Sequence, residues 1–213
     1  MKPSIIAMLF LCILTFSATS LELNNELITF IQKRFGTEAV NRLQQWEKIT
    51  NLSKDINEPN KLKLVNTFFN QTKFISDIKH WGKEDYWATP LELLATNGGD
   101  CEDYSIAKYF TLREMGVPID KMKITYVKAV KLNQAHMVLA YYTEPDAEPL
   151  ILDNLINEIK PASQRSDLVP VYSFNGEGLW LSKLRGQEGK RIGSSDKLKN
   201  WQDLLTRHQN LMD

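Results

Sequence analysis

The apolar residues between Leu21 and about Phe74 recur every three or four positions within a mostly polar stretch. Residues with this spacing fall on one face of an α-helix, so each such group predicts a helix with one buried side. Three groups follow one another along the chain, namely Leu27, Phe30, Ile31 and Phe35, then Val40, Leu43 and Trp46, then Leu62, Val65, Phe68 and Phe69. The pattern therefore predicts three helices that make an N-terminal helical layer.

Two helices with clear start signals are predicted next. Thr89-Pro90-Leu91-Glu92 combines a capping hydroxyl, a proline at the first helical position and a carboxylate three residues after the cap. This motif starts a short helix that ends at Gly98-Gly99. Asp100 caps a second helix that runs to about Met115, before a glycine and a proline. The predicted buried side of this helix carries Ile106, Tyr109, Phe110 and Leu112.

Beyond Met115 the apolar period changes from helical spacing to two, which is typical of strands. Consecutive antiparallel strands are predicted over residues 124–127, 136–142 and 149–155, with a further pair around Asn175-Gly176. Residues 196–208 are again predicted as a helix, with Leu198, Trp201, Leu204 and Leu205 facing inward. Helices followed by an antiparallel sheet predict an α+β fold, with a single domain over residues 21–213.

The N-terminal segment, residues 1–20, has the composition of an export signal. Lys2 precedes an apolar stretch over residues 5–16, and Ala18 and Ser20 stand where signal peptidase favours small residues. The stretch of about twelve residues is shorter than the roughly 20 that a membrane-spanning helix needs. We therefore predict a signal peptide cleaved after Ser20. The alternatives are an uncleaved anchor and lipoprotein processing at Cys12, although the bulky Leu11 precedes that cysteine.

Charge and cysteine content narrow the classes of function. The 26 Lys and Arg residues balance 26 Asp and Glu residues, and no basic face suggests a nucleic-acid partner. Removal of the signal peptide would take Cys12 with it and leave Cys101 as a lone thiol in an oxidising compartment. Such a cysteine indicates either a reactive thiol or an intermolecular disulfide.

The position of Cys101 favours the reactive thiol. It lies in the first turn of the helix predicted to begin at Asp100, where free backbone N–H groups and the helix dipole stabilise a thiolate. The same N–H groups could hold the oxyanion of a tetrahedral intermediate. The alternative is a buried cysteine that packs as a small apolar residue, but the neighbouring Gly99, Glu102 and Asp103 make that placement poor.

Two polar residues interrupt predicted apolar strands and are candidate partners for the thiol. His136 opens the run Met137-Val138-Leu139-Ala140, and Asp153 follows Leu150-Ile151-Leu152. If these strands are neighbours packed on the Cys101 helix, they supply a base and its orienting carboxylate. Each residue alone could instead be a satisfied core polar group. Two further histidines are weaker candidates: His80 as base would need the opposite chain order, and His208 is predicted at the exposed end of the last helix.

At this point the sequence resembles the bacterial transglutaminase-like cysteine proteinases, in particular their LapG-type periplasmic branch. The similarity runs from about Trp46 to Trp180. It is carried by Gly99-Asp100-Cys101-Glu102-Asp103-Tyr104 with Ala107-Lys108-Tyr109, by Ala135-His136-Met137-Val138-Leu139, by Leu152-Asp153-Asn154, by His80-Trp81, by Tyr86-Trp87-Ala88-Thr89-Pro90 and by Phe174-Asn175-Gly176-Glu177-Gly178-Leu179-Trp180.

The resemblance implies a papain-like, transglutaminase-like core in a periplasmic endopeptidase. Its triad would be Cys101, His136 and Asp153, and its substrate the N-terminal region of a large surface adhesin, whose release disperses biofilm. An inner-membrane cyclic di-GMP receptor would sequester the protease as its partner. The resemblance also places a calcium site on Asp100, Glu102 and Asp103.

The charges beside Cys101 also favour a bound cation. Carboxylates next to Cys101 should raise the pKa of the thiol and oppose the thiolate. A hard divalent cation would offset them, and ligands that are all oxygen favour calcium over zinc. The alternative is that acids in a first helical turn only complement the helix dipole.

The oxyanion donor and the class of reaction each have more than one candidate at the level of sequence. Papain-like enzymes place a glutamine before the cysteine as an oxyanion donor, and residues 93–99 contain none. The backbone N–H of Cys101 is therefore the first candidate donor and the indole of Trp81 the second. The same triad could also serve an acyl-transferring transglutaminase or a cell-wall amidase, and a non-catalytic peptide-binding module is the third rival.

Overall fold

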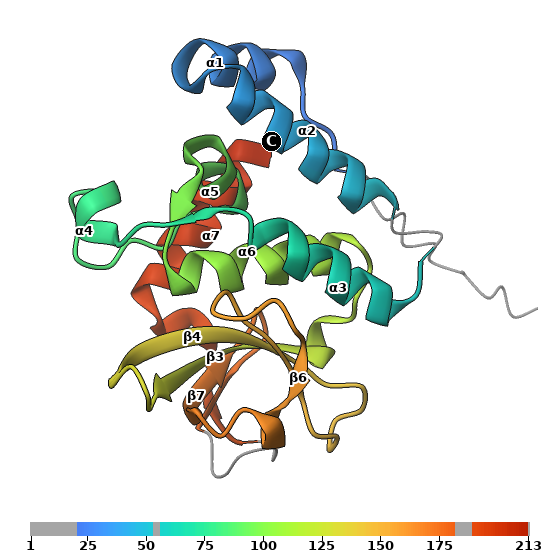
Figure 1. Cartoon of the computed structure of the whole chain (residues 1–213), viewed down its shortest axis with the longest axis vertical. Coiled ribbons are helices and arrows are strands. Elements are labelled where there is room, and N and C mark those ends of the chain that lie inside the picture. The colour runs from blue at the N-terminus through green and yellow to red at the C-terminus, as the bar shows by residue number, and fades with distance from the viewer. Residues whose placement is uncertain (1–20, 53–55, 182–188, 213) are drawn as a thin grey trace, which may run out of the picture.

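The computed structural model describes residues 21–52, 56–181 and 189–212, and Figure 1 shows its helices stacked on one side of an antiparallel sheet. The predicted signal peptide lies outside the described residues. Among those that are described, no helix is both long and apolar enough to span a membrane. The predicted α+β fold is confirmed.

The three predicted N-terminal helices are present as α1 (Asn25–Phe35), α2 (Thr37–Asn51) and α3 (Glu58–Phe69). The side chain of Asn24 caps α1 by accepting from Leu27 N, which ties up one of the free N–H groups of the first turn. Most of the apolar residues that were predicted to face the core in these helices are buried. Phe30 and Phe35 are exceptions, at 55% and 37% exposed, because α1 lies at the edge of the helical layer and buries only its Ile31 side.

The segment before the candidate nucleophile is built from short elements. They are β1 (Lys73–Phe74), α4 (Asp77–His80), α5 (Pro90–Thr96) and β2 (Gly98–Gly99), and β1 pairs with β2 in parallel.

The end of α5 differs from the prediction. The helix ends at Thr96 because Asn97 adopts the left-handed conformation, and Gly98-Gly99 then forms a strand. Gly99 has no room for a side chain, since a Cβ there would lie 2.4 Å from Asp103 Oδ2. This close approach lets the strand lead directly into the next helix.

Among the described residues, the large sheet contains seven strands in the order β6-β5-β4-β3-β7-β8-β9, and its neighbouring strands are antiparallel. Short 3-10 turns at Ile119–Lys121, Ala162–Gln164 and Ser195–Lys197 connect or precede its elements. The strands are β3 (Met122–Ala129), β4 (Gln134–Tyr141), β5 (Leu150–Leu152), β6 (Lys160–Pro161), β7 (Leu168–Phe174), β8 (Leu179–Leu181) and β9 (Lys190–Gly193). The strand predicted over residues 149–155 is shorter than expected because the chain leaves the sheet at Asp153.

The central helix α6 (Cys101–Glu114) is packed between the other helices and the sheet. Its residues from Glu102 to Leu112 are all buried, so the helix lies in the core rather than on its surface. It joins one apolar cluster that includes Leu43 and Trp46 from α2 and Ile124 and Leu139 from the sheet. The start of α6 is thereby held rigidly over β4.

The last helix, α7 (Lys199–Met212), closes the core with Trp201 and Leu204, both 0% exposed. Contrary to the prediction, His208 does not lie at an exposed end. Its ring packs 4.3 Å from the ring of Phe110, because α7 runs across α6 at this point. Burial and the nearby Arg113 lower the pKa of His208 to about 4, so the packed imidazole is neutral at pH 7.

Candidate active site

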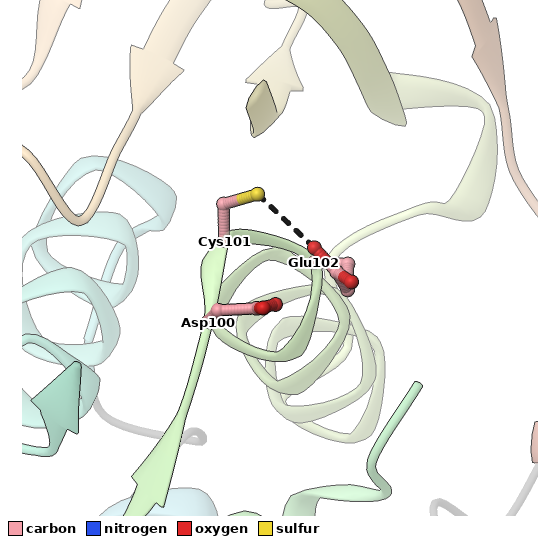
Figure 2. Close-up of side chains that lie close together, drawn as sticks. All are labelled: Asp100, Cys101 and Glu102. Atoms are coloured by element: carbon pink, nitrogen blue, oxygen red, sulfur yellow. Dashed lines mark hydrogen bonds between the residues drawn. The ribbon is translucent and has the colours of Figure 1, made fainter. Parts of the chain in front are cut away.

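Cys101 is the first residue of α6, as predicted, and the residue is partly buried. Asp100 precedes the helix, and its N–H donates to Asp103 Oδ2 at 3.1 Å, which fixes the entry of the chain into α6. The thiol donates to Glu102 Oε2 at 3.0 Å (Figure 2). Ser105 Oγ donates to the carbonyl of Cys101 at 2.9 Å and secures the first turn.

The surroundings of the thiol oppose its ionisation. Burial, Glu102 and Asp100 raise the pKa of Cys101 far above its ordinary value, and the N–H of Met137 only partly offsets them. The favourable helix dipole is therefore outweighed by carboxylates and desolvation. This confirms the sequence-based expectation that the acidic neighbours raise the thiol pKa.

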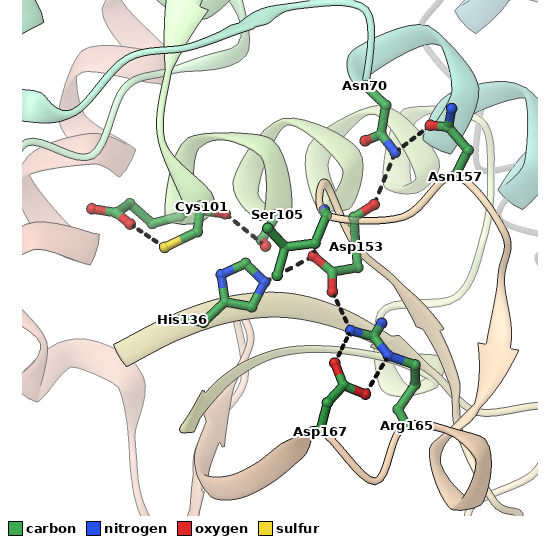
Figure 3. Close-up of polar contacts among 10 residues, drawn as sticks. Asn70, Cys101, Ser105, His136, Asp153, Asn157, Arg165 and Asp167 are labelled. Atoms are coloured by element: carbon green, nitrogen blue, oxygen red, sulfur yellow. Dashed lines mark hydrogen bonds and ion pairs between the residues drawn. The ribbon is translucent and has the colours of Figure 1, made fainter. Parts of the chain in front are cut away.

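His136 and Asp153 come together through the pairing of β4 with β5. The register Leu139↔Leu152 places the histidine of β4 near the residue that follows β5. His136 Nε2 and Asp153 Oδ1 are 2.8 Å apart, and the two residues are 3% and 1% exposed. Figure 3 shows the imidazole between the Cys101 sulfur and the Asp153 carboxylate, so the structure brings together all three predicted triad residues.

The Asp153 carboxylate is charged in this setting. Burial opposes its ionisation, but the hydrogen bond and charge of His136 lower the pKa, with help from the Leu155 N–H and Arg165, to about 2. A charged carboxylate on Nε2 fixes the imidazole tautomer and directs Nδ1 to the other side of the ring. Nδ1 is then the nitrogen available to a thiol.

His80 has a separate set of contacts. It lies at the end of α4, where Nε2 is 2.8 Å from Thr96 Oγ1 and the ring packs edge-on against Trp81. These contacts give His80 a packing role between α4 and α5.

The predicted acidic residues belong to a larger cluster. Carboxylate oxygens of Asp77, Asp100 and Asp103 lie within 4.8 Å of one another, and so do those of Asp77, Asp85 and Glu102. Asp77 lies on α4 and Asp85 in the loop after it. Sequence analysis missed both, because neither belongs to the acidic run around Cys101. Asp103 is 0% exposed and accepts from Ala88 N at 2.7 Å, so it joins this loop to α6.

This cluster has the chemistry of a site for a hard cation. Burial raises the pKa of Glu102 to about 9 and that of Asp77 to about 6, and it also raises the pKa of Asp103. The buried oxygens Asp77 Oδ1 and Asp100 Oδ1 accept no hydrogen bond from the residues that the structure describes. Grouped carboxylates with unsatisfied oxygens fit a divalent cation that prefers oxygen ligands.

The proposed oxyanion donors are both present. Cys101 opens a helix, where backbone N–H groups have no partner within the helix. The Trp81 indole N–H is buried and has no acceptor in the described part of the chain. Its ring packs 4.7 Å from that of Tyr86. The role of either group stays a prediction.

Two buried basic side chains near Asp153 also escaped the sequence analysis. Arg165 Nη2 donates to Asp153 Oδ2 at 2.7 Å, and Lys108, on α6, is 0% exposed with the charge of Asp153 nearby. Lys108 had been noted only as part of a family motif. A lone arginine in a polar loop gives no local signal of its contact.

The chain resembles known proteins over most of its length. Residues 28–182 match the family described as bacterial transglutaminase-like cysteine proteinase, BTLCP. The structure is similar to that of Legionella pneumophila LapG, with 43% identity, a TM-score of 0.74 and coverage of 86% of this chain and 95% of that chain.

Two further structures of the same Legionella protein are also similar. The EGTA-treated form is 43% identical with a TM-score of 0.74, covering 85% of this chain and 97% of that chain. The calcium-bound form is 44% identical with a TM-score of 0.72 and the same coverage. No curated protein matches the chain.

Proposed function

Because the chain belongs to the bacterial transglutaminase-like cysteine proteinases, we propose that it is a calcium-dependent endopeptidase with the triad Cys101, His136 and Asp153. Family membership and 43% identity to LapG make it a cysteine peptidase. The observation that carries the assignment of residues is the buried 2.8 Å contact of His136 Nε2 with Asp153 Oδ1, on the far side of the imidazole from Cys101 (Figure 3).

Catalysis starts when Nδ1 of His136 takes the proton of the Cys101 thiol. The thiolate attacks the carbonyl carbon of the scissile peptide, and the Cys101 N–H donates to the oxyanion that forms. The C–N bond then breaks, and His136 returns the proton to the leaving amine, which leaves a thioester on Cys101. A water deprotonated by His136 hydrolyses this thioester to a carboxylic acid and the free thiol. Asp153 orients the imidazole and stabilises its charged form in both halves.

The acidic cluster would hold calcium through Asp100, Glu102 and Asp103, together with Asp77 and Asp85. A bound calcium ion supplies positive charge that offsets the carboxylates beside the thiol. Support comes from the unsatisfied oxygens of Asp77 and Asp100 and from the calcium-bound structure of a protein 44% identical to this one.

The substrate that we propose is the N-terminal region of a large surface adhesin, cleaved in the periplasm so that the adhesin is released and biofilm disperses. The partner would be the periplasmic domain of an inner-membrane cyclic di-GMP receptor, which sequesters the protease. The resemblance supports both, and the signal-like residues 1–20 support export.

The test uses residues 21–213, loaded with calcium, and the N-terminal segment of an adhesin from the same genome. We expect one defined cut, complete loss of cutting in Cys101→Ala, and unchanged cutting in Asp146→Asn, the control at an exposed loop position. Mass spectrometry with and without an added primary amine separates hydrolysis from acyl transfer. Incorporation of the amine into the product would contradict the proposal. So would digestion of peptidoglycan by a protein that leaves the adhesin segment uncut.

A further inference from the structure

We propose that Arg165 is a positioning residue of the active site, whose guanidinium fixes the Asp153 carboxylate in the orientation that presents Oδ1 to His136. The inference rests on the triad proposed above. Arg165 touches neither the thiol nor the imidazole, so its effect passes through Asp153.

The contacts of Asp153 show what the arginine contributes. Oδ1 accepts from the Leu155 N–H at 3.0 Å and lies 2.8 Å from His136 Nε2. Oδ2 accepts from Arg165 Nη2 at 2.7 Å (Figure 3). Each oxygen therefore has a fixed direction, and rotation of the carboxylate would break contacts on both. Without the guanidinium, the buried and charged Oδ2 would lose its ion-pair partner, which is costly in the core.

Arg165 is itself held in place. Its Nε donates to Asp167 Oδ1 at 3.0 Å and its Nη2 to Asp167 Oδ2 at 2.9 Å, and the residue is 4% exposed. The carbonyl of Asp167 accepts from Val130 N at 2.8 Å, which ties this segment to the end of β3. The planar fork thus joins two carboxylates in a defined geometry that a lysine ammonium cannot reproduce.

The segment that carries Asp153 is anchored from the other side as well. Asn70 Nδ2 donates to the Asp153 carbonyl and to Asn157 Oδ1, both at 2.8 Å. These amide contacts fix the backbone, whereas Arg165 reaches the carboxylate itself. The titratable and charged groups around Asp153 are His136 on β4, Lys108 on α6 and Arg165, with Asp167 behind the arginine.

The experiment compares Arg165→Gln, Arg165→Lys and Asp167→Asn with the wild type, all loaded with calcium. We expect Arg165→Gln to lower kcat by about 10- to 100-fold with KM changed by less than about threefold, since outer partners that orient catalytic groups have effects of this size. Arg165→Lys should recover part of the loss, because it keeps the charge but not the fork. Asp167→Asn should lose less than Arg165→Gln, because the contact with Asp153 remains. Arg191→Gln, at an exposed arginine that donates to the Glu177 carbonyl, is the matched control.

A second readout needs no substrate. In ¹⁵N-labelled Cys101→Ala protein, the proton on His136 Nε2 should give a slowly exchanging downfield signal, which should weaken or vanish when Arg165→Gln is added. The rate of Cys101 alkylation by iodoacetamide in protein that retains Cys101 should fall in Arg165→Gln in parallel with kcat. A merely structural role would lower the melting temperature without moving the histidine signal.

The proposal is overturned if folded Arg165→Gln keeps kcat within about threefold of the wild type, or if the His136 signal is unchanged. If Arg165→Gln does not fold, the same criteria apply to Arg165→Lys, which keeps the charge but loses the planar fork. Failure of the proposed triad would look different, since His136→Ala would then leave both the alkylation rate and turnover unchanged.

Discussion

The substitution Asp153→Asn tests the electrostatics of the triad through stability as well as activity. The pKa of Asp153 is about 2 against an ordinary 3.8, with burial raising it and the contacts with His136, Leu155 and Arg165 lowering it more. At about 1.4 kcal/mol per pKa unit, the charged form adds about 2 kcal/mol to the free energy of unfolding at pH 7. Asparagine is neutral and should lose this contribution.

The direction in which this stability changes with pH follows from the lowered pKa of Asp153. The folded-state pKa lies below the unfolded value, so the contribution is complete above pH 3.8 and is lost as the pH falls towards 2. The difference in free energy of unfolding between wild type and Asp153→Asn should therefore be constant from pH 7 to about pH 5 and shrink below about pH 4.

Urea unfolding followed by tryptophan fluorescence at pH 7, 5 and 3.5 measures this difference. Asp146→Asn, at an exposed loop position, is the control and should change stability by less than about 0.5 kcal/mol. Turnover of Asp153→Asn should fall by about three to four orders of magnitude, by analogy with other triads. Equal stability of wild type and Asp153→Asn at pH 7, or a difference that grows as the pH falls to 3.5, would refute the reasoning.

Three further predictions follow from the site and the core. EGTA should stop cleavage and lower the melting temperature, with both restored by added calcium, and metal analysis should find one calcium ion per chain; full activity in excess EGTA would argue against the site. Asp77→Asn should raise the calcium concentration needed for half-maximal stabilisation, as should Glu102→Ala, whereas unchanged calcium titrations would remove Asp77 from the ligand set. His208→Leu should make the protein more stable to acid. Because the folded-state pKa of His208 is about 4, its contribution to the free energy of unfolding is complete above pH 6.5 and declines by about 2 kcal/mol, after allowance for partial exposure, as the pH falls to 4. Urea unfolding of both proteins at pH 7 and 4.5 measures the difference.

Local signals in the sequence predicted the longer helices and most of the longer strands, whereas the one-turn helix α4 was not predicted. Thr89 and Asp100 mark helix starts because capping is decided within a few residues, and the alternating runs around β3 and β4 are long enough to be unambiguous. The end of α5 was misplaced because Asn97, rather than the following glycine, took the left-handed conformation. Such a choice depends on the pairing of β2 with β1, which lies outside the local pattern.

The candidate site was predictable where a residue marked a helix start, as Cys101 does, or broke an apolar pattern. His136 and Asp153 stand out in strands, whereas Asp77, Asp85 and Arg165 sit in polar segments where a charged side chain is unremarkable. Their importance arises from tertiary contacts, such as the arginine that reaches Asp153 across twelve positions of the chain. The same limit explains His208, whose contact with Phe110 exists only once α7 packs on α6.

The placement of the nucleophile and its base on different layers has a consequence for how the enzyme matures. Cys101 starts a helix, while His136 and Asp153 lie where β4 pairs with β5, and this part of the sheet must also dock against α6. Contacts between segments that are far apart in the chain form slowly during folding. A newly made chain with its helices formed but its sheet not yet docked would carry the thiol without its base. Proteolytic competence would then emerge only at the final docking step, so incompletely folded copies could not digest their neighbours.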